Sequence, residues 1–330
     1  MSKRVVSQEE MQAVYERLKT PYKYGEVMKF EREACDCPVV FRYNNKWYMA
    51  FVKFDYEGKN SGYDTHLAES KNLTEWKYLY PILERSKNNR WDSRQIAGYP
   101  AFIQNDLCGK YEIQKINGGY IIPYLGGSLD GYETDPLFMG QCKTRDILDP
   151  TQYQRREKSI LSPTDPDARK GETLTLYKSN MFIDNAQKLG YPYVNVYNAK
   201  GEDHRESIFL AVSKDGEHWE RYGKKAIISD DGDTFIHGDP QILKFGELYI
   251  MVYYVLRDEK AFNIFACSYD LLHWTKWTGK PLIESEYAWE NVYAHKPWIV
   301  MDNGILYHFY CAVNDKKERF IALATNKPLK

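Results

Sequence analysis

One hairpin pattern recurs along this chain and constrains its fold more than any other sequence feature. In residues 35–54, a short polar segment precedes a proline, and an apolar run, a polar turn and an aromatic-rich run follow. The same order returns in residues 238–254, where Gly238-Asp239-Pro240 comes first, and again in residues 295–310. A short unit that recurs along a chain buries its apolar face by stacking against its neighbours, so the pattern predicts a repeat fold.

Each copy of the hairpin continues with a strand-like run, a turn and a tryptophan. This second phrase appears in residues 65–76, 208–219 and 264–274, and two weaker units begin near residues 100 and 180. The five units start roughly 60–80 residues apart, somewhat more than the ~40–50 residues of common propeller repeats. We therefore predict an all-β fold, a five-bladed β-propeller with four strands in each blade, over residues 31–330.

The N-terminal region is expected to form a short helical arm, residues 1–30. Ser7 followed by Glu10 predicts a capping box, and Pro21 ends the helix. Apolar residues at helical spacing form one face: Met11, Val14, Tyr15 and Leu18. This face has to be buried either against its own chain or against a second copy, so a homodimer through the helix is one of two expectations.

Composition excludes several classes of partner. Lys and Arg number 45 against 46 Asp and Glu, and no basic block stands out, so neither nucleic acid nor an anionic membrane is expected. No apolar run approaches the roughly 18 residues of a membrane span, and the N-terminus lacks a signal-peptide core. Six cysteines in strand-like runs then predict a cytoplasmic protein with free thiols. No second Cys/His pair accompanies Cys35-Asp36-Cys37 at zinc-site spacing, so no metal site is predicted there.

The predicted fold brings distant polar residues together. The first strand of every propeller blade lines the central channel, so the residues that open these strands converge on one mouth. They are Asp36, Tyr99, Asn180, Asp239, His295 and Lys296. Gathering carboxylates, an imidazole and an ammonium group in one place is costly unless they bind or react with a polar molecule. A ligand site at this mouth is therefore expected.

Paired carboxylates between aromatic walls suit glycoside hydrolysis, in which one acts as base or nucleophile and the other as acid. The first unit opens with Asp36-Cys37-Pro38-Val39-Val40, and Leu67-Ala68-Glu69-Ser70 returns in altered form as Leu210-Ala211-Val212-Ser213 and Ala266-Cys267-Ser268. With the stretch 215–219, these motifs resemble the five-bladed propeller glycosidases, which include glycoside hydrolase families 43, 62, 32, 68, 117 and 130. The resemblance spans residues 36–325.

The resemblance implies catalytic roles. The first-blade Asp is the general base of family 43, which places that role on Asp36. Family 43 carries Glu-Gly-Pro in blade four, where this chain has Gly238-Asp239-Pro240, so the acid is left open between Asp239, as donor or pKa tuner, and His295. A histidine near its ordinary pKa suits proton transfer. Family 117 has a histidine proposed as the acid and a dimerising helical arm, so the likeness leans toward families 43 and 117.

Further residues are expected to bind substrate. Rings and polar groups near the mouth make up this set: Trp91, Arg94, Tyr99, Asn180, His237, Glu290, Lys296 and Trp298. Glu290 is also a competing acid, whereas Glu206, which opens an outer strand, is expected to point away and to pair with a surface arginine. The family often holds a divalent cation in the channel, but no ligand set for one is assigned here.

The expected function is hydrolysis of a glycosidic bond in a short oligosaccharide. One alternative is a glycoside phosphorylase of the family 130 type, in which Lys296, His237 and Arg94 would hold phosphate. The other is a non-catalytic, carbohydrate-binding propeller.

Overall fold

Nearly all regular structure of this protein is β-strand. The computed structural model describes residues 4–55, 62–229 and 232–329, and about 51% of the structure is strand with one α-helix. The prediction of an all-β fold is confirmed. Within these residues, no helix has the length and apolar character needed to cross a membrane.

Antiparallel pairing arranges the strands of the described residues in five groups of four. Single parallel pairs, Glu206 with Ile236 and Ala261 with Tyr293, join the last three groups into one twelve-stranded sheet. Group 1 contains β2 (Glu33–Tyr43), β3 (Lys46–Asp55), β4 (Asp64–Ser70) and β5 (Trp76–Leu83). Group 2 contains β6 (Gln95–Gly98), β7 (Tyr120–Gly127), β8 (Phe138–Thr144) and β9 (Gln154–Arg155). Group 3 contains β10 (Thr175–Ile183), β11 (Tyr193–Lys200), β12 (Glu206–Ser213) and β13 (Glu220–Tyr222).

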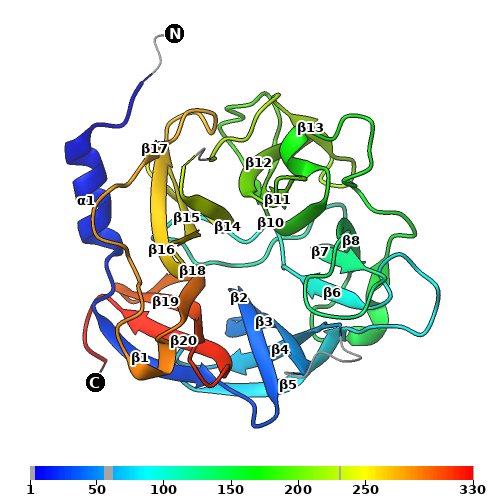
Figure 1. Ribbon diagram of the computed structural model, residues 1–330, viewed down its shortest axis with the longest axis horizontal. Coiled ribbons are helices and arrows are strands. Elements are labelled where there is room, and N and C mark those ends of the chain that lie inside the picture. Colours follow the sequence, from blue (N-terminus) through cyan, green and yellow to red (C-terminus); the bar gives the residue numbers. More distant parts are fainter. Residues whose placement is uncertain (1–3, 56–61, 230–231, 330) are drawn as a thin grey trace.

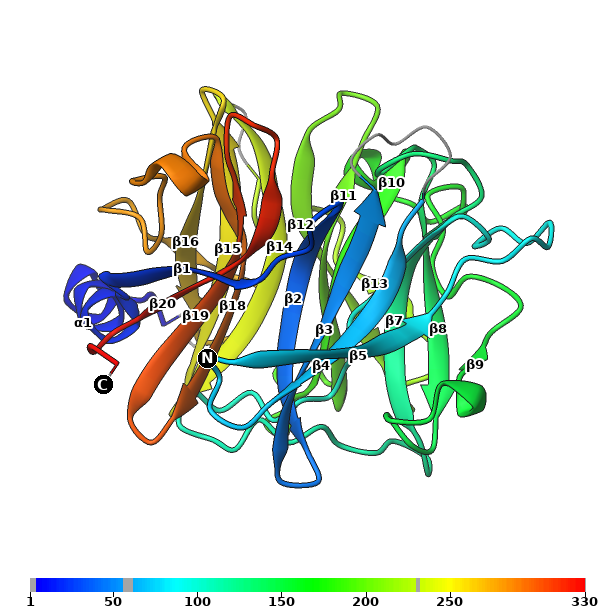
Figure 2. The same cartoon turned by 90° about the horizontal axis from the view of Figure 1, so that it is seen from below.

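Group 4 contains β14 (Thr234–Phe245), β15 (Leu248–Arg257), β16 (Lys260–Ser268) and β17 (Thr275–Lys276). Group 5 contains β18 (Tyr293–Asp302), β19 (Ile305–Val313), β20 (Arg319–Thr325) and β1 (Tyr22–Met28). The groups follow one another around a common centre (Figure 1), and in the side view the strands β2, β15 and β18 run steeply while β1 and β5 lie across them (Figure 2). The arrangement is propeller-like.

The N-terminal strand completes the last group of the chain. β1 pairs antiparallel with β20, from Tyr22 opposite Thr325 to Met28 opposite Ile321. Residues 22–28, which the sequence placed in the helical arm, are therefore the outer strand of group 5. This pairing joins the two ends of the chain, because the outer strand comes from the N-terminal end and the other three from the C-terminal end.

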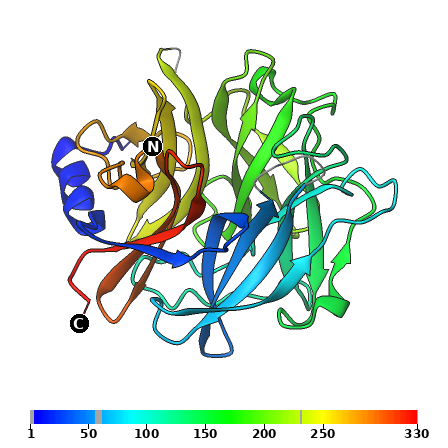
Figure 3. The same cartoon turned by 60° about the horizontal axis from the view of Figure 1, so that its bottom comes forward.

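Helix α1 (Gln8–Leu18) packs against its own chain. The predicted capping box is present, with Ser7 Oγ accepting from the Glu10 backbone N–H at 3.1 Å. The apolar face is buried, and Tyr15 stacks on Trp277 with ring centroids 5.1 Å apart. The helix lies outside the strands, beside the orange and red segments (Figure 3). Because one chain already covers the apolar face, its burial needs no second copy.

The groups are held together by side chains that cross between neighbours. Trp298 of β18 donates from Nε1 to the Val40 carbonyl of β2 at 2.9 Å, which joins group 5 to group 1. Phe102 and Tyr193 meet edge to face, with centroids 5.4 Å apart, between the segment after β6 and group 3. Such aromatic pairs contribute about 0.5–1.5 kcal/mol beyond their buried area. The high aromatic content therefore stabilises the contacts between groups.

The recurring X-Pro pattern forms a β-bulge in three innermost strands. The register of the first hairpin shifts between Asp36 and Val39 in β2, between Gly238 and Gln241 in β14, and between His295 and Trp298 in β18. Each bulge contains a residue with positive φ: Cys37 at 52°, Asp239 at 52° and Lys296 at 55°. Each of these precedes a proline, which has no N–H to donate to the strand ladder. The other non-glycine residues with positive φ in the described part of the chain lie outside the strands, so these three differ from them by interrupting an innermost strand.

Candidate active site

Two sets of strand starts meet at one end of the groups. In an antiparallel group, the first and third strands begin at the same end, and the loop between the second and third strands lies there too. Glu206 begins β12 and Arg319 begins β20, so both lie at the end where β2 and β18 begin. Tyr132 and Glu133 lie in the loop between β7 and β8 at this end. We call this end the mouth.

Asp36 is a fully buried carboxylate that receives three hydrogen bonds on one oxygen. Its Oδ2 accepts from Arg319 Nη1 at 2.6 Å, from Tyr132 Oη at 2.8 Å and from Lys296 Nζ at 3.0 Å. Burial alone would raise the pKa of Asp36, but the charges of Lys296 and Arg319 hold it well below its usual value. Asp36 is therefore ionised across the physiological pH range.

Lys296 bridges two carboxylates. Its Nζ lies 3.0 Å from Asp36 Oδ2 and 3.0 Å from Glu133 Oε1, and it also donates to Tyr132 Oη at 2.8 Å. Burial would lower the pKa of Lys296, but Asp36 and Glu133 help to keep it well above the usual value. Glu133 itself is 28% exposed and has a positive φ of 51°. A charged carboxylate is thus presented at the mouth from a strained loop position.

Hydrogen bonds from Gln95 and an ion pair at Asp135 hold the loop that carries Glu133. Gln95 of β6 donates from Nε2 to the Leu129 carbonyl at 3.0 Å and to the Thr134 carbonyl at 3.2 Å, and its Oε1 accepts from the Thr134 N–H at 3.1 Å. Lys200 pairs with Asp135 at 2.8 Å. These contacts on both sides of Glu133 position its carboxylate.

Glu206 is a buried carboxyl group that stays protonated at neutral pH. Burial first, and then the charge of Glu133, raises its pKa to about 8. Asn198 donates from Nδ2 to Glu206 Oε2 at 2.7 Å. The prediction that Glu206 points away and pairs with a surface arginine is wrong. The reason is that β12 begins at the same end as β10, which turns the first residue of this strand toward the mouth.

Asp239 and Lys178 form a buried pair without hydrogen bonds to either charged end. Asp239 Oδ2 lies 3.6 Å from Lys178 Nζ, and neither atom has a hydrogen-bond partner among the described residues. Burial raises the pKa of Asp239, while Lys178 and Lys296 oppose this effect. Tyr99 and Trp298 flank the amine, since Lys178 Nζ lies 5.8 and 5.1 Å from their ring centroids.

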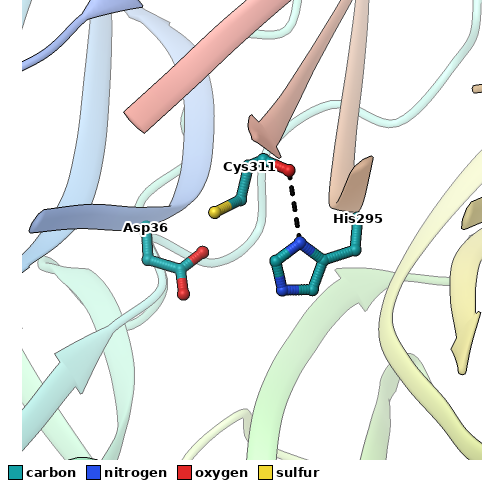
Figure 4. A group of neighbouring side chains, drawn as sticks. All are labelled: Asp36, His295 and Cys311. Atoms are coloured by element: carbon teal, nitrogen blue, oxygen red, sulfur yellow. Dashed lines mark hydrogen bonds between the residues drawn. The ribbon is translucent and has the colours of Figure 1, made fainter. Parts of the chain in front are cut away.

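His295 is a neutral imidazole beside Asp36. Its Nδ1 donates to the Cys311 carbonyl at 3.2 Å, and Asp36 of β2, His295 of β18 and Cys311 of β19 point toward one another (Figure 4). Burial lowers the pKa of His295 to about 3. A group that is unprotonated at neutral pH has no proton to donate, so this environment does not favour His295 as the acid.

The same three residues are the group of potential metal ligands in the described part of the chain, with ligand atoms within 4.8 Å of one another. They do not fit the divalent cation that the propeller glycosidases often hold. Lys296 and Arg319 already place two positive charges on Asp36, which would repel a cation. Burial also raises the pKa of Cys311 well above its usual value, which keeps the thiol protonated.

The structure separates the predicted substrate-binding residues into two sets. In the first set, Lys296 pairs with Asp36 and Glu133, and Tyr99 and Trp298 flank Lys178. Asn180 uses its Oδ1 to accept from the Ile242 N–H at 2.7 Å, and His237 packs on Tyr253 with centroids 6.0 Å apart. These two polar side chains are buried in contacts between strands.

Three predicted residues have structural partners. Trp91 stacks on Tyr124 with centroids 5.8 Å apart, and Arg94 pairs with Asp130 at 2.6 Å at the base of the Glu133 loop. Glu290 is fully buried, where it pairs with Lys23 at 2.6 Å and accepts from Tyr310 Oη at 2.8 Å. With both of its oxygens engaged, Glu290 fits a structural role better than that of an acid.

Comparisons with known proteins identify the family of this chain. No protein-family model matches the chain, and no curated protein sequence matches it. Two solved structures, however, are each 39% identical and cover 98% of this chain and 97% of their own: a complex of BT0996 with RGII, at a TM-score of 0.94, and a protein described as a glycoside hydrolase, at 0.93.

A thermostable family-43 glycoside hydrolase shares the fold at 15% identity and a TM-score of 0.62, with 89% of each chain covered. At the identity and coverage of the first two structures, this chain belongs to the glycoside hydrolases. The predicted membership in the propeller glycosidase superfamily is supported at this level, while the lean toward families 43 and 117 stays a prediction.

Proposed function

We propose that this protein hydrolyses a glycosidic bond of an oligosaccharide at the mouth of a five-bladed propeller whose blades are groups 1 to 5. Glu206 is the proton donor, and Glu133 is the base or nucleophile. The observation that carries the proposal is a protonated carboxyl, Glu206, beside a charged and more exposed carboxylate, Glu133. Two carboxyl groups in such different environments are the requirement of glycoside hydrolysis.

Glu206 meets the chemical needs of an acid. A donor works best when its pKa lies near the working pH, and the pKa of Glu206 is raised to about 8. Asn198 occupies Oε2, which leaves Oε1 to carry the proton. When this proton moves to the leaving oxygen, the product alcohol departs neutral and Glu206 becomes a carboxylate.

Glu133 fits the second role better than Asp36. Three donors, two of them cationic, saturate Asp36 Oδ2, and a carboxylate with such a low pKa is a weak base. Glu133 is charged, partly exposed and held by a single lysine. Asp36 then acts through Lys296 and Arg319 as a positioning residue. In an inverting reaction Glu133 takes a proton from water, and in a retaining reaction it attacks the sugar carbon.

The substrate class rests on the fold relatives. The BT0996 structure is described as a complex with RGII, which supports a saccharide ligand for the same mouth in this chain. A phosphorylase would need cations available for phosphate. Of the three residues expected to hold it, Arg94 pairs with Asp130 and Lys296 pairs with two carboxylates, which favours hydrolysis.

The test compares Glu206→Gln and Glu133→Gln on two kinds of substrate. On a panel of oligosaccharides, both variants are expected to lose about 10²–10⁴-fold in kcat, as for lost acid or base groups. The dinitrophenolate of a dinitrophenyl glycoside leaves without protonation. This substrate should therefore restore activity to Glu206→Gln but not to Glu133→Gln. If Glu133 is the nucleophile, azide should restore Glu133→Gln with formation of a glycosyl azide of inverted configuration, whereas azide attack on the glycosyl-enzyme of Glu206→Gln gives a glycosyl azide of retained configuration.

Equal losses on both substrates for Glu206→Gln, or full activity of either variant, would refute the assignment. If Asp36→Asn, rather than Glu133→Gln, is rescued by azide, the base is Asp36, as the family 43 likeness implies. Release of sugar 1-phosphate only in the presence of phosphate would establish a phosphorylase instead. Unchanged sugar binding by all variants without turnover by the wild type would establish a binding protein.

A further inference from the structure

Two buried charged atoms near the mouth have no hydrogen-bond partner. Lys178 is 1% exposed and Asp239 is 4% exposed, yet Lys178 Nζ and Asp239 Oδ2 are both unpartnered within the described residues. The polar atoms of a buried ionic group normally all make hydrogen bonds. A hydrogen bond left unmade costs the full free energy of desolvating that group. An incomplete pair of this kind indicates that a further polar group belongs between them.

The spacing of the pair specifies the missing group. The two atoms are 3.6 Å apart, which is longer than a charge-assisted hydrogen bond of about 2.7–2.9 Å. An oxygen placed about 2.8 Å from each atom would complete a triangle with both. This oxygen has to accept from the ammonium and donate to the carboxylate. A neutral hydroxyl group does both, whereas a carboxylate cannot donate, an ammonium cannot accept, and a phosphate would place further negative charge beside Asp239.

The pair is next to the proposed acid and is held rigidly. Asn198 Oδ1 accepts from the Asp239 backbone N–H at 3.2 Å, and Asn198 Nδ2 donates to Glu206 Oε2 at 2.7 Å. One amide therefore links the backbone of Asp239 to the carboxyl of Glu206. Asp239 lies in the β14 bulge, and the ring of Trp298 lies 5.1 Å from Lys178 Nζ. These contacts leave the two charged ends little freedom to reach each other.

One further buried polar atom near the mouth lacks a hydrogen-bond partner within the described residues. Tyr63 is 1% exposed, and its Oη is also unpartnered within the same described ranges. The ring of Tyr63 meets that of Tyr132 edge to face, with centroids 5.8 Å apart, which places Tyr63 near the mouth. Unpartnered polar atoms thus come from β10, from β14 and from the segment before β4.

We propose that Lys178 and Asp239 form a subsite that recognises one hydroxyl group of the bound sugar. The hydroxyl accepts a hydrogen bond from Lys178 Nζ and donates one to Asp239 Oδ2. This inference rests on the proposed function and adds to it a selection among sugars. A site built to bind a hydroxyl group rejects the analogue that lacks it, because both buried partners are then left unsatisfied.

The experiment uses the full-length protein and a p-nitrophenyl glycoside that the wild type cleaves, with each monodeoxy derivative of its sugar. One deoxy position is expected to lower kcat/KM by about 10²–10⁴-fold, and the others by far less. Lys178→Met should lower kcat/KM for the parent glycoside by a similar factor. With the deoxy sugar that matters, Lys178→Met should cause little further loss, because the same interaction is already gone.

Binding provides a readout separate from turnover. In the Glu206→Gln background, calorimetry with the product monosaccharide and its deoxy derivatives should show the same single position losing affinity, and Lys178→Met should remove that preference. Lys143→Met is the matched control, since Lys143 pairs with Glu217 away from the mouth and should leave the deoxy profile unchanged. Circular dichroism and Tm verify that each variant is folded, and Lys178→Arg, which keeps a donor, tests a variant that retains the charge.

Two results would overturn the proposal. Deoxy derivatives that are all cleaved and bound as well as the parent sugar would show that a resident water completes the pair. Fully additive losses from Lys178→Met and from the deoxy position would show that the two do not contact each other. A wild type that cleaves no glycoside would instead refute the proposed function, so the two failures are distinguishable.

Discussion

Glu133 and Glu206 interact through their charges. After burial, the charge of Glu133 is the largest influence that raises the pKa of Glu206, to about 8. Glu206 is buried beside Asn198, whereas Glu133 is ion-paired with Lys296 and 28% exposed. The arrangement gives the mouth one protonated carboxyl group and one charged carboxylate, and the following predictions test this arrangement and the residues around it.

The pH dependence of activity is expected to report Glu206. Because the acid has to be protonated, kcat/KM should fall as the pH rises through about 8. Glu133→Gln removes a negative charge that raises this pKa, so the alkaline limb of the residual activity should move to lower pH. Initial rates of the wild type and of Glu133→Gln, measured against pH on a dinitrophenyl and on an unactivated glycoside, give the alkaline limb of each protein. An alkaline limb that does not move in Glu133→Gln would contradict the coupling.

The stability of the protein should depend on the ionisation of the same residue. The pKa of Glu206 is raised above its unfolded value, so its contribution to stability is fully present below pH 4.5 and is lost as the pH rises to about 8. Glu206→Gln removes this loss. Its Tm should exceed that of the wild type by a few °C near pH 8 and by less near pH 5. Thermal unfolding at both pH values checks this, and a constant difference would argue against a protonated, buried Glu206.

Asp36→Asn should destabilise the protein strongly. The substitution leaves Lys296 and Arg319 near a neutral amide, and breaking a buried ion pair costs about 3–5 kcal/mol. The pKa of Asp36 is depressed, so its stabilisation is present above the unfolded value and is lost as the pH falls through the folded one. Denaturant unfolding at pH 7 and in acid measures both effects. A variant as stable as the wild type at pH 7 would remove Asp36 from the centre of this network.

Gln95→Leu should lower catalysis more than substrate binding. Gln95 makes three hydrogen bonds to Leu129 and Thr134, on both sides of the loop that carries Glu133. Without them the carboxylate is held less well, and misplacement of a reacting group costs on the order of 10²-fold in rate. Steady-state kinetics should show the loss in kcat rather than in KM. Gln141→Leu, also in group 2, is the control: it removes the hydrogen bond that Gln141 Oε1 accepts from Trp219 Nε1 of group 3, and it should retain kcat.

Glu290→Gln separates a structural carboxylate from a catalytic one. Glu290 binds Lys23 of β1 and Tyr310 of β19, both in group 5, so loss of its charge should lower the free energy of unfolding by about 2 kcal/mol. The value of kcat/KM at a temperature where the variant is folded should stay close to that of the wild type. A large fall in kcat with unchanged Tm would return Glu290 to the candidates for the acid.

Much of the architecture follows from local sequence. The X-Pro pattern at residues 36–38, 239–240 and 296–297 marks the bulges of three innermost strands, because proline cannot donate to the ladder. The capping box of Ser7 and Glu10 identifies the start of α1. Strand β1 has no such local signal, because its pairing partner, β20, lies almost 300 residues away and leaves no periodicity in the nearby sequence.

The sequence by itself determined the repeated hairpins, the helix and the gathering of Asp36, Asp239, His295 and Lys296 at one end of the molecule, because these depend on strand period and on proline. Only the tertiary structure decided which of the carboxyl groups carries a proton. That choice depends on burial and on neighbours from other groups, as for Glu206 beside Glu133 and for Asp36 between Lys296 and Arg319. Charge and solvent exposure act through space, so no spacing along the chain records them.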